Sequence, residues 1–333
     1  MSAPILTHEI ATPQVSAPPP AIETVDLTKR YGALAAVEGL SITIQPGQIY
    51  GFIGPNGAGK TTTIRMLAGL LPPTSGKILI GGEDISQHPD RARWLVGYMP
   101  DFFGVYDDMK VWEYLDFFAR CYRIPPAKRA AMIDDLLHLV DLSSKREAFV
   151  ESLSRGMKQR LCLAHALVHD PSILLLDEPA SGLDPRARIE MRELLRELGR
   201  MGKTVLISSH ILTELAEMCD AVGIIERGRL LASGSVNEIA KVARADRVLL
   251  VRPLAWNAGA DSDRISALLM AFPGVQELFV ADEGIEIPFV GDDRAASELL
   301  KYLIDNEVPV VGFGEATSDL EDIFLAVTKG EVQ

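Results

Sequence analysis

The residues from 54 to 62 have the types and spacing of a phosphate-binding loop. They fit the pattern G-x-x-x-x-G-K-[ST] at each fixed position, and they are Gly54, Pro55, Asn56, Gly57, Ala58, Gly59, Lys60, Thr61 and Thr62. Glycines let the backbone curl so that several N–H groups point at one anion, and a following helix N-terminus adds partial positive charge. We expect Lys60 to reach the terminal phosphates and the Thr61 hydroxyl to hold Mg²⁺. The alternative is a glycine-rich turn that matches the pattern by chance.

An acidic pair, Asp177 and Glu178, ends a short apolar run bounded by Pro171 and Pro179. The first carboxylate has the chemistry to hold Mg²⁺, directly or through water. The second has the chemistry to polarise an attacking water and accept its proton. The alternative is a charged strand end that only keeps the loop soluble. Together, the loop and the acidic pair predict a nucleotide hydrolase.

Both motifs require strands and helices that alternate along the chain. The apolar run 49–53 predicts a strand before the phosphate loop, and a helix follows over 63–70. The run 173–177 is typical of a strand buried on both faces of a parallel sheet, where ligands bind at the carboxyl ends. The further elements we expect are a helix over 186–201, a strand over 204–208, a helix over 211–218, and hairpin strands over 221–226 and 229–233.

Further elements are expected before the phosphate loop and between the two motifs. We predict strands over 21–27, 39–44, 77–80 and 94–100, with a hairpin turn at 81–84. A helical pattern runs over 111–142 and is broken at Pro125 and Pro126, and another covers 153–169. His165 and His169 lie in that second helical pattern, and we expect surface or capping roles for both.

The last third of the chain has a different pattern. From about residue 241 the order is strand, helix, two hairpin strands, helix and strand, which indicates a small ferredoxin-like α+β module. The predicted bounds are strand 247–253, helix 263–272, strands 275–281 and 285–290, helix 293–306 and strand 308–313. A final helix over 319–327 begins at the capping box Ser318 to Glu321. The module has no cluster of catalytic residue types, so we favour regulation or docking over a second enzyme.

Composition narrows the class of protein. A length of 333 residues suggests two domains, and the proline-rich residues 1–21 predict a flexible tail. The formal charge of −13 disfavours nucleic acid as a partner, because an acidic surface repels phosphate backbones. We expect the three widely spaced cysteines to be buried free thiols in a reducing cytosol. We expect no secretory signal, because the first residues lack a basic region followed by an apolar one, and no run reaches the length of about 18 apolar residues that a membrane-spanning helix needs.

Five further motifs make the chain resemble the nucleotide-binding subunit of an ATP-binding cassette (ABC) transporter over about residues 22–235. The run 153–160 looks like the signature helix of that family, and 181–184 looks like its D-loop. His210 falls at the switch histidine, Tyr31 at the aromatic that stacks on adenine, and 98–101 at the Q-loop. From its own stretch we favour a core aromatic for Tyr31 over an exposed stacking platform, and the resemblance reverses this in favour of the stacking position.

The resemblance implies an α/β fold, a P-loop NTPase ABC cassette. Such a cassette has a RecA-like mixed-sheet core, an antiparallel β subdomain and an α-helical subdomain, which we expect at about 100–160. We expect the cassette to cover 22–240, after the 1–21 tail. A C-terminal α+β ferredoxin-like domain is then expected at 241–333.

The resemblance also implies roles for single residues. Lys60, Glu178 and His210 are expected to be catalytic, with Tyr31 on adenine and the loop 54–62 on the phosphates. Another subunit would contribute Ser154, Gly156 and Asp184 to the same nucleotide, so the chain must pair. The expected metal ligands are Thr61, Asp177 and Asp101.

This sequence departs from the family pattern at three of these places. Arg155 stands where the signature has glycine, and Met157 stands where it has glutamine. The serine and glycine that face a γ-phosphate remain, so phosphate recognition should survive. Asp101 replaces the usual glutamine, so its metal or water contact is expected to be changed, and a solvated loop residue is the alternative.

We therefore expect a head-to-tail homodimer that encloses two ATP molecules with Mg²⁺ and works with an integral membrane permease. The expected location is the cytoplasm, peripheral on the cytoplasmic face of the cell (inner) membrane. The ending 317–328 looks like that of ABC-2-type exporter ATPases. One rival is a soluble ABC ATPase acting on ribosomes or nucleic acid, and another is a binding module that does not hydrolyse ATP. The cargo and the permease are not predicted.

Overall fold

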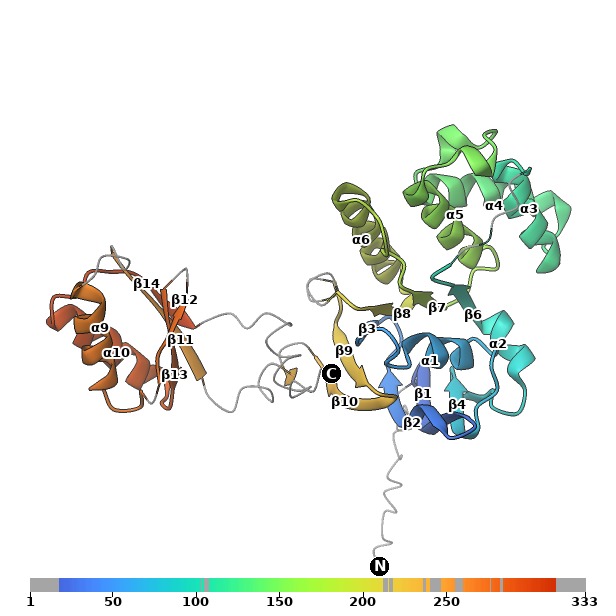
Figure 1. Ribbon diagram of the computed structural model, residues 1–333. Coiled ribbons are helices and arrows are strands. Elements are labelled where there is room, and N and C mark those ends of the chain that lie inside the picture. The colour runs from blue at the N-terminus through green and yellow to red at the C-terminus, as the bar shows by residue number, and fades with distance from the viewer. Residues whose placement is uncertain are drawn as a thin grey trace, which may run out of the picture. The chain divides into compact units, whose positions relative to one another are not determined.

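The computed structural model describes residues 18–102, 104, 108–211, 215, 218–235, 238–239, 247–254, 260–275, 277–281 and 284–315 (Figure 1). The chain divides into two compact units. The first unit consists of the residues up to 48 together with 61–206, and the second consists of residues 49–60 together with those from 207 onward. The predicted tail up to residue 17, most of the predicted helix 211–218 and all of 319–327 lie outside the described residues.

The first unit contains a four-stranded antiparallel sheet in the order β2-β1-β4-β5. Leu40, Ile42 and Ile44 of β2 are buried in alternation with exposed residues, as expected of a sheet with one solvated face. The three predicted strands are confirmed, with β1 ending later and β2 and β4 beginning earlier than predicted, and the hairpin turn predicted at 81–84 includes the short strand β5. Their bounds are β1 (Ile22–Tyr31), β2 (Leu34–Ile44), β4 (Ser75–Ile80) and β5 (Glu83–Asp84).

The same unit carries six α-helices in its described residues. They are α1 (Lys60–Leu67, whose first residue belongs to the second unit), α2 (Pro89–Leu95), α3 (Val111–Cys121), α4 (Pro126–Leu139), α5 (Arg155–Leu167) and α6 (Pro185–Arg200). Short 3₁₀ turns, η1 (Ser143–Lys145) and η2 (Val150–Ser152), join α4 to α5. The predicted strand over 94–100 is wrong at its start. Pro89 begins a short helix that ends with Trp94 and Leu95, and only β6 (Val96–Met99) is extended.

Six strands hydrogen-bond in the order β10-β9-β3-β8-β7-β6. The pairs β3–β9 and β6–β7 are parallel, while β10 pairs antiparallel with β9, so the sheet is mixed as expected. Every residue of β3, β7 and β8 is buried, and β3 and β7 are accordingly almost uniformly apolar, whereas β8 also buries Thr204, Ser208 and Ser209. Their bounds are β3 (Ile49–Ile53), β7 (Ile173–Asp177), β8 (Thr204–Ser209), β9 (Ala221–Glu226) and β10 (Arg229–Gly234).

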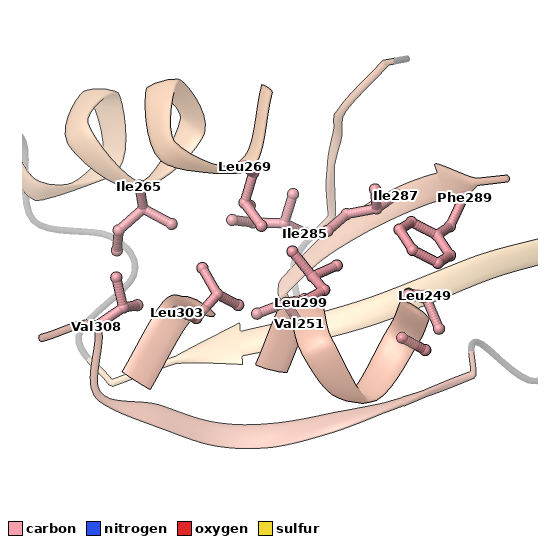
Figure 2. Close-up of a cluster of buried hydrophobic side chains, with 11 residues drawn as sticks. Leu249, Val251, Ile265, Leu269, Ile285, Ile287, Phe289, Leu299, Leu303 and Val308 are labelled. Carbon is pink, nitrogen blue, oxygen red and sulfur yellow. The ribbon is translucent and has the colours of Figure 1, made fainter. Parts of the chain in front are cut away.

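The C-terminal part of the second unit has the predicted ferredoxin-like order. Its elements are β11 (Arg247–Pro253), α9 (Ala260–Met270), β12 (Phe279–Ala281), β13 (Gly284–Phe289), α10 (Asp293–Asp305) and β14 (Val310–Glu315). The strands form an antiparallel sheet in the order β12-β13-β11-β14. Figure 2 shows the apolar cluster between this sheet and the two helices, in which Leu269, Ile287 and Leu299 are fully buried.

Two expectations about the helical part need correction. Cys162 is buried as expected, but Cys121, the last residue of α3, is exposed, and Cys219 is half-buried. His165 and His169 are not simply surface residues, because α5 packs against aromatic side chains of α3 and the turn after it. The His165 ring lies 3.7 Å from the Phe118 ring, and the His169 ring stacks on Tyr122 at 4.0 Å. In the described part of the chain, no helix has the length and apolar character needed to cross a bilayer.

Candidate nucleotide site

The loop after β3 has the backbone that the glycine spacing predicted. Gly57 and Gly59 have φ of 83° and 108°, values that side-chain-bearing residues rarely adopt. A Cβ on Gly54 would lie 2.3 Å from the carbonyl oxygen of Ile225, so only glycine fits there. The backbone N–H of Gly228 donates to the carbonyl of Ala58 at 2.9 Å. The β9–β10 turn therefore supports the loop, and no local sequence signal indicates this long-range contact.

Lys60 is buried within that loop, with 6% of its surface exposed. Its ammonium donates to the carbonyl of Gly54 at 2.6 Å and to that of Pro55 at 3.2 Å. These bonds hold a positive charge at the centre of a backbone nest. Such a charge is suited to pairing with a phosphate that the nest binds.

Thr61 and Asp177 come together although they are far apart in the sequence. The Thr61 hydroxyl donates to Asp177 Oδ1 at 3.1 Å, and Asp177 is only 1% exposed. One hydroxyl and one carboxylate are oxygen ligands of the kind Mg²⁺ prefers, so the donor set fits that ion. Among the described residues, no three His, Cys, Asp or Glu side chains gather as a metal-binding group.

Glu178 follows Asp177 in an unusual backbone conformation. Its φ is 51°, which costs a residue with a side chain about 1 kcal/mol. Its carbonyl accepts the N–H of Ser181 at 3.0 Å, which closes the turn after β7. The turn therefore fixes the backbone from which the carboxylate extends, and a strained residue of this kind often marks a functional site.

The predicted signature and D-loop residues begin two helices. Ser154 caps α5 by accepting the N–H of Met157 at 3.3 Å, and Asp184 caps α6 by accepting the N–H of Ala187 at 3.0 Å. A Cβ on Gly156 would lie 3.3 Å from the Ala187 Cβ, so the first turns of α5 and α6 are close together. A cleft of about 280 Å³ lies between these two helix starts.

The remaining predicted site residues lie at the surface. Tyr31 is 52% exposed, and the ammonium of Lys29 lies 5.4 Å from the centre of its ring. The interpretation of Tyr31 as a core aromatic is therefore wrong. Asp101 and His210 are also exposed. Tyr98 of β6, quoted only as part of the Q-loop motif, is half-buried and bonds the Arg65 side chain of α1, and its burial raises its pKa.

Comparisons with known proteins, by sequence and by fold, also indicate a nucleotide-binding protein. A family model described as ABC transporter matches residues 37–181. The Nod factor export ATP-binding protein I of Ralstonia nicotianae is 42% identical over 320 residues, covering 94% of this chain and 95% of that protein. The protein of the same name from Burkholderia lata is 44% identical over 312 residues, covering 94% and 98%.

Solved structures with similar folds are ATP-binding cassettes. One is described as the ATP binding subunit of an ABC transporter, with 31% identity and a TM-score of 0.61, covering 67% of this chain and 92% of that one. Another is cbiO1 from Clostridium perfringens, part of the ABC transporter complex cbiONQ, with 27% identity and a TM-score of 0.61, covering 68% and 94%. On these matches and the site geometry, the chain belongs to the ABC transporter family, as an ATP-binding subunit with ATPase activity.

Proposed function

We propose that two copies of this chain bind two ATP molecules head to tail and drive export by a separate membrane permease. The observation that carries the proposal is the bond between Thr61 and Asp177, which joins the phosphate loop's helix to the acidic pair. Each copy has one phosphate loop and one signature helix, so a composite site needs two chains. The full-length relatives, named for Nod factor export, support the direction of transport.

Each residue of the site then has a chemical role. The amides of 54–62 and the Lys60 ammonium bind the β- and γ-phosphates, and Tyr31 stacks on the adenine. Glu178 accepts a proton from the attacking water while the exposed His210 contacts the γ-phosphate. Ser154, Gly156 and Asp184 of the other copy complete the site. The capping bonds of Ser154 and Asp184 hold these groups at the starts of their helices.

Mg²⁺ would be held by Thr61 and Asp177, where it neutralises charge that develops on the phosphates. Asp101 is exposed and carries a charge where the family has a neutral amide, so we propose that it reaches the ion through water. The chain's own contribution is a fixed pair of oxygens, because Asp177 is buried at the end of β7 and hydrogen-bonded to Thr61.

We further propose that the protein is peripheral on the cytoplasmic face of the cell membrane and that its ending places it among ABC-2-type exporters. Nod factor, the cargo named for the relatives, is the first candidate cargo. The rival function on ribosomes or nucleic acid has no support among these full-length relatives. Co-purification of a membrane permease from detergent extracts supports the proposal, and recovery of ribosomal material instead contradicts it.

The experiment that tests the site is ATP hydrolysis by Lys60→Ala. Losing the only side-chain cation inside the described loop should lower the rate by at least about 100-fold. Arg200→Met is the matched control, because this exposed arginine of α6 pairs only with Glu197 among the described residues. A Lys60→Ala protein that hydrolyses ATP at the parent rate contradicts the assignment.

A further inference from the structure

Arg155, at the first position of α5, contacts the loop that follows the acidic pair. Its guanidinium Nη2 donates to the carbonyl oxygen of Ser181 at 3.0 Å. Gln159, one turn further along α5, donates its Nε2 to the same oxygen at 3.1 Å. A carbonyl oxygen has two lone pairs, so these donors together satisfy it completely. The start of α5 therefore holds Ser181 at two points.

Gly182, the next residue of this loop, is shaped to accept the guanidinium. Its φ is 65°, and a Cβ built on it would lie 2.3 Å from the Arg155 guanidinium carbon and within 2.5 Å of both terminal nitrogens. The guanidinium therefore fills the space that a side chain at 182 would need. A side chain at 182 would therefore displace the guanidinium, and the positive φ also favours glycine at this position.

The charge of Arg155 is directed at backbone rather than at an acid. Two other arginines that line the same cleft have carboxylate partners: Arg160 pairs with Asp141 at 3.2 Å, and Arg186 pairs with Glu190 at 3.1 Å. In the part of the chain that the structure describes, Arg155 makes no ion pair, and its hydrogen bond is the one to Ser181. A charged donor gives a stronger bond to a carbonyl than a neutral one, so this contact is suited to holding a loop.

The same loop connects Arg155 to the hydrolytic carboxylate. Ser181 donates its N–H to the carbonyl of Glu178 at 3.0 Å, while its own carbonyl accepts from Arg155. A displacement of the first turn of α5 is therefore transmitted through Ser181 to the strained turn at Glu178. Ser154, which faces the other copy's ATP in the proposed function, directly precedes Arg155.

We infer that Arg155 is a positioning residue that couples the two ATP sites of the pair. When Ser154 engages the partner's nucleotide, the bonds from Arg155 through Ser181 adjust Glu178 in the site of its own chain. A glycine at 155, as in the usual signature, has no side chain to make this contact. The inference depends on the proposed head-to-tail pairing and adds a route by which one site affects the other.

The first test measures the ATPase rate against ATP concentration for Arg155→Met, Arg155→Lys and the control Arg200→Met. Arg155→Met should lower kcat about 10-fold and reduce the Hill coefficient to about 1, as expected for a lost coupling. Its affinity for a fluorescent ATP analogue should stay within about 2-fold of the parent, because the phosphate loop is untouched. Arg155→Lys keeps a donor for Ser181 and should recover part of both kcat and the Hill coefficient. Arg200→Met should match the parent.

The second test is a double-mutant cycle with Gly182→Ala, which displaces the guanidinium without changing its charge. If the contact exists, the double variant should be at most about 2-fold slower than the worse single variant. If the fold loss in rate of the double variant equals the product of the two single losses, Arg155 and Gly182 act independently, which contradicts the contact. Thermal unfolding of each variant separates a loss of coupling from a loss of fold, and Arg155→Lys serves as the probe if Arg155→Met does not fold.

The role of Arg155 and the proposed ATPase site can be disproved separately. If Lys60→Ala is inactive while Arg155→Met and Arg155→Lys keep the parent kcat and Hill coefficient, the coupling by Arg155 is overturned and the proposed function stands. If Lys60→Ala retains the parent rate, the proposed function itself fails.

Discussion

At the scale of single residues, the site is held by backbone as much as by side chains. Glu178 keeps a left-handed φ of 51° that its turn imposes, and the loop glycines have backbone angles or close contacts that other residues do not tolerate. Asp177 is buried and fixed by Thr61. The chemistry is therefore assigned to groups that have little freedom to move.

Replacing Glu178 with glutamine separates proton transfer from this geometry. Glutamine has the same size and backbone needs but does not accept a proton, so the ATPase rate should fall by about 100-fold to 10,000-fold. Binding of ATP should be unchanged, because the phosphate loop is intact. Steady-state hydrolysis and equilibrium binding measure the two effects. Hydrolysis at the parent rate would remove Glu178 from the proposed mechanism.

Some parts of the site could be predicted from the sequence, and others could not. The spacing of Lys60 and Thr61 predicted the loop, and the order of apolar and acidic residues predicted Asp177 at a buried strand end, because both signals are local. The support of Ala58 by Gly228, and of Ser181 by Arg155, joins residues from different elements. No spacing rule indicates such contacts.

At the scale of elements, α5 contacts several parts of the first unit. Its N-terminal turn holds the loop after β7, and its C-terminal half packs His165 against Tyr114 and Phe118 of α3. Burial lowers the pKa of His165 to about 4, with a smaller contribution from His169. Between about pH 4 and pH 6.5, the imidazole is therefore neutral in the folded protein, whereas the same side chain in the unfolded protein is protonated.

This difference predicts a specific loss of stability in acid. The pKa of His165 is lower in the folded state than the 6.5 of a free side chain, so the unfolded state binds more protons below pH 6.5. The free energy of unfolding should therefore fall as pH drops from about 6.5 to about 4, by at most about 1.4 kcal/mol per pH unit. Denaturant titrations at several pH values measure this dependence, and His165→Phe should remove the part of it that His165 contributes. If the free energy of unfolding depends on pH equally in the parent and in His165→Phe, then His165 does not contribute to the loss of stability in acid.

Element boundaries were less predictable than element types. The runs 49–53 and 173–177 gave the correct strands because burial on both faces requires continuous apolar residues. The strand predicted over 94–100 includes Trp94 and Leu95, which are apolar and directly precede Val96. The proline at 89 instead begins a helix of one to two turns, too short for its periodicity to show.

At the scale of the whole molecule, the part beyond residue 240 has its own core. Its sheet of four strands and its two helices bury Leu249, Phe289 and Leu303 within the module itself. We predict that residues 241–333 expressed alone will unfold in one cooperative transition. Leu299→Ala, at a fully buried position, should cost about 2–5 kcal/mol of that stability. Val311→Ala, at an exposed position, is the control, and a fragment without a cooperative transition would contradict the domain boundary.

The central claim is that two chains complete each ATP site between them. Its most direct test is the mass in solution of Glu178→Gln with ATP, since blocked hydrolysis should retain the closed pair. We predict a species of twice 36.3 kDa. Adding Ser154→Glu, which places a negative charge at the signature serine, should leave ATP binding intact and return the protein to the mass of one chain. Equal dimerisation with and without the Ser154 substitution, or a Glu178→Gln protein that stays at 36.3 kDa with ATP, would contradict the account.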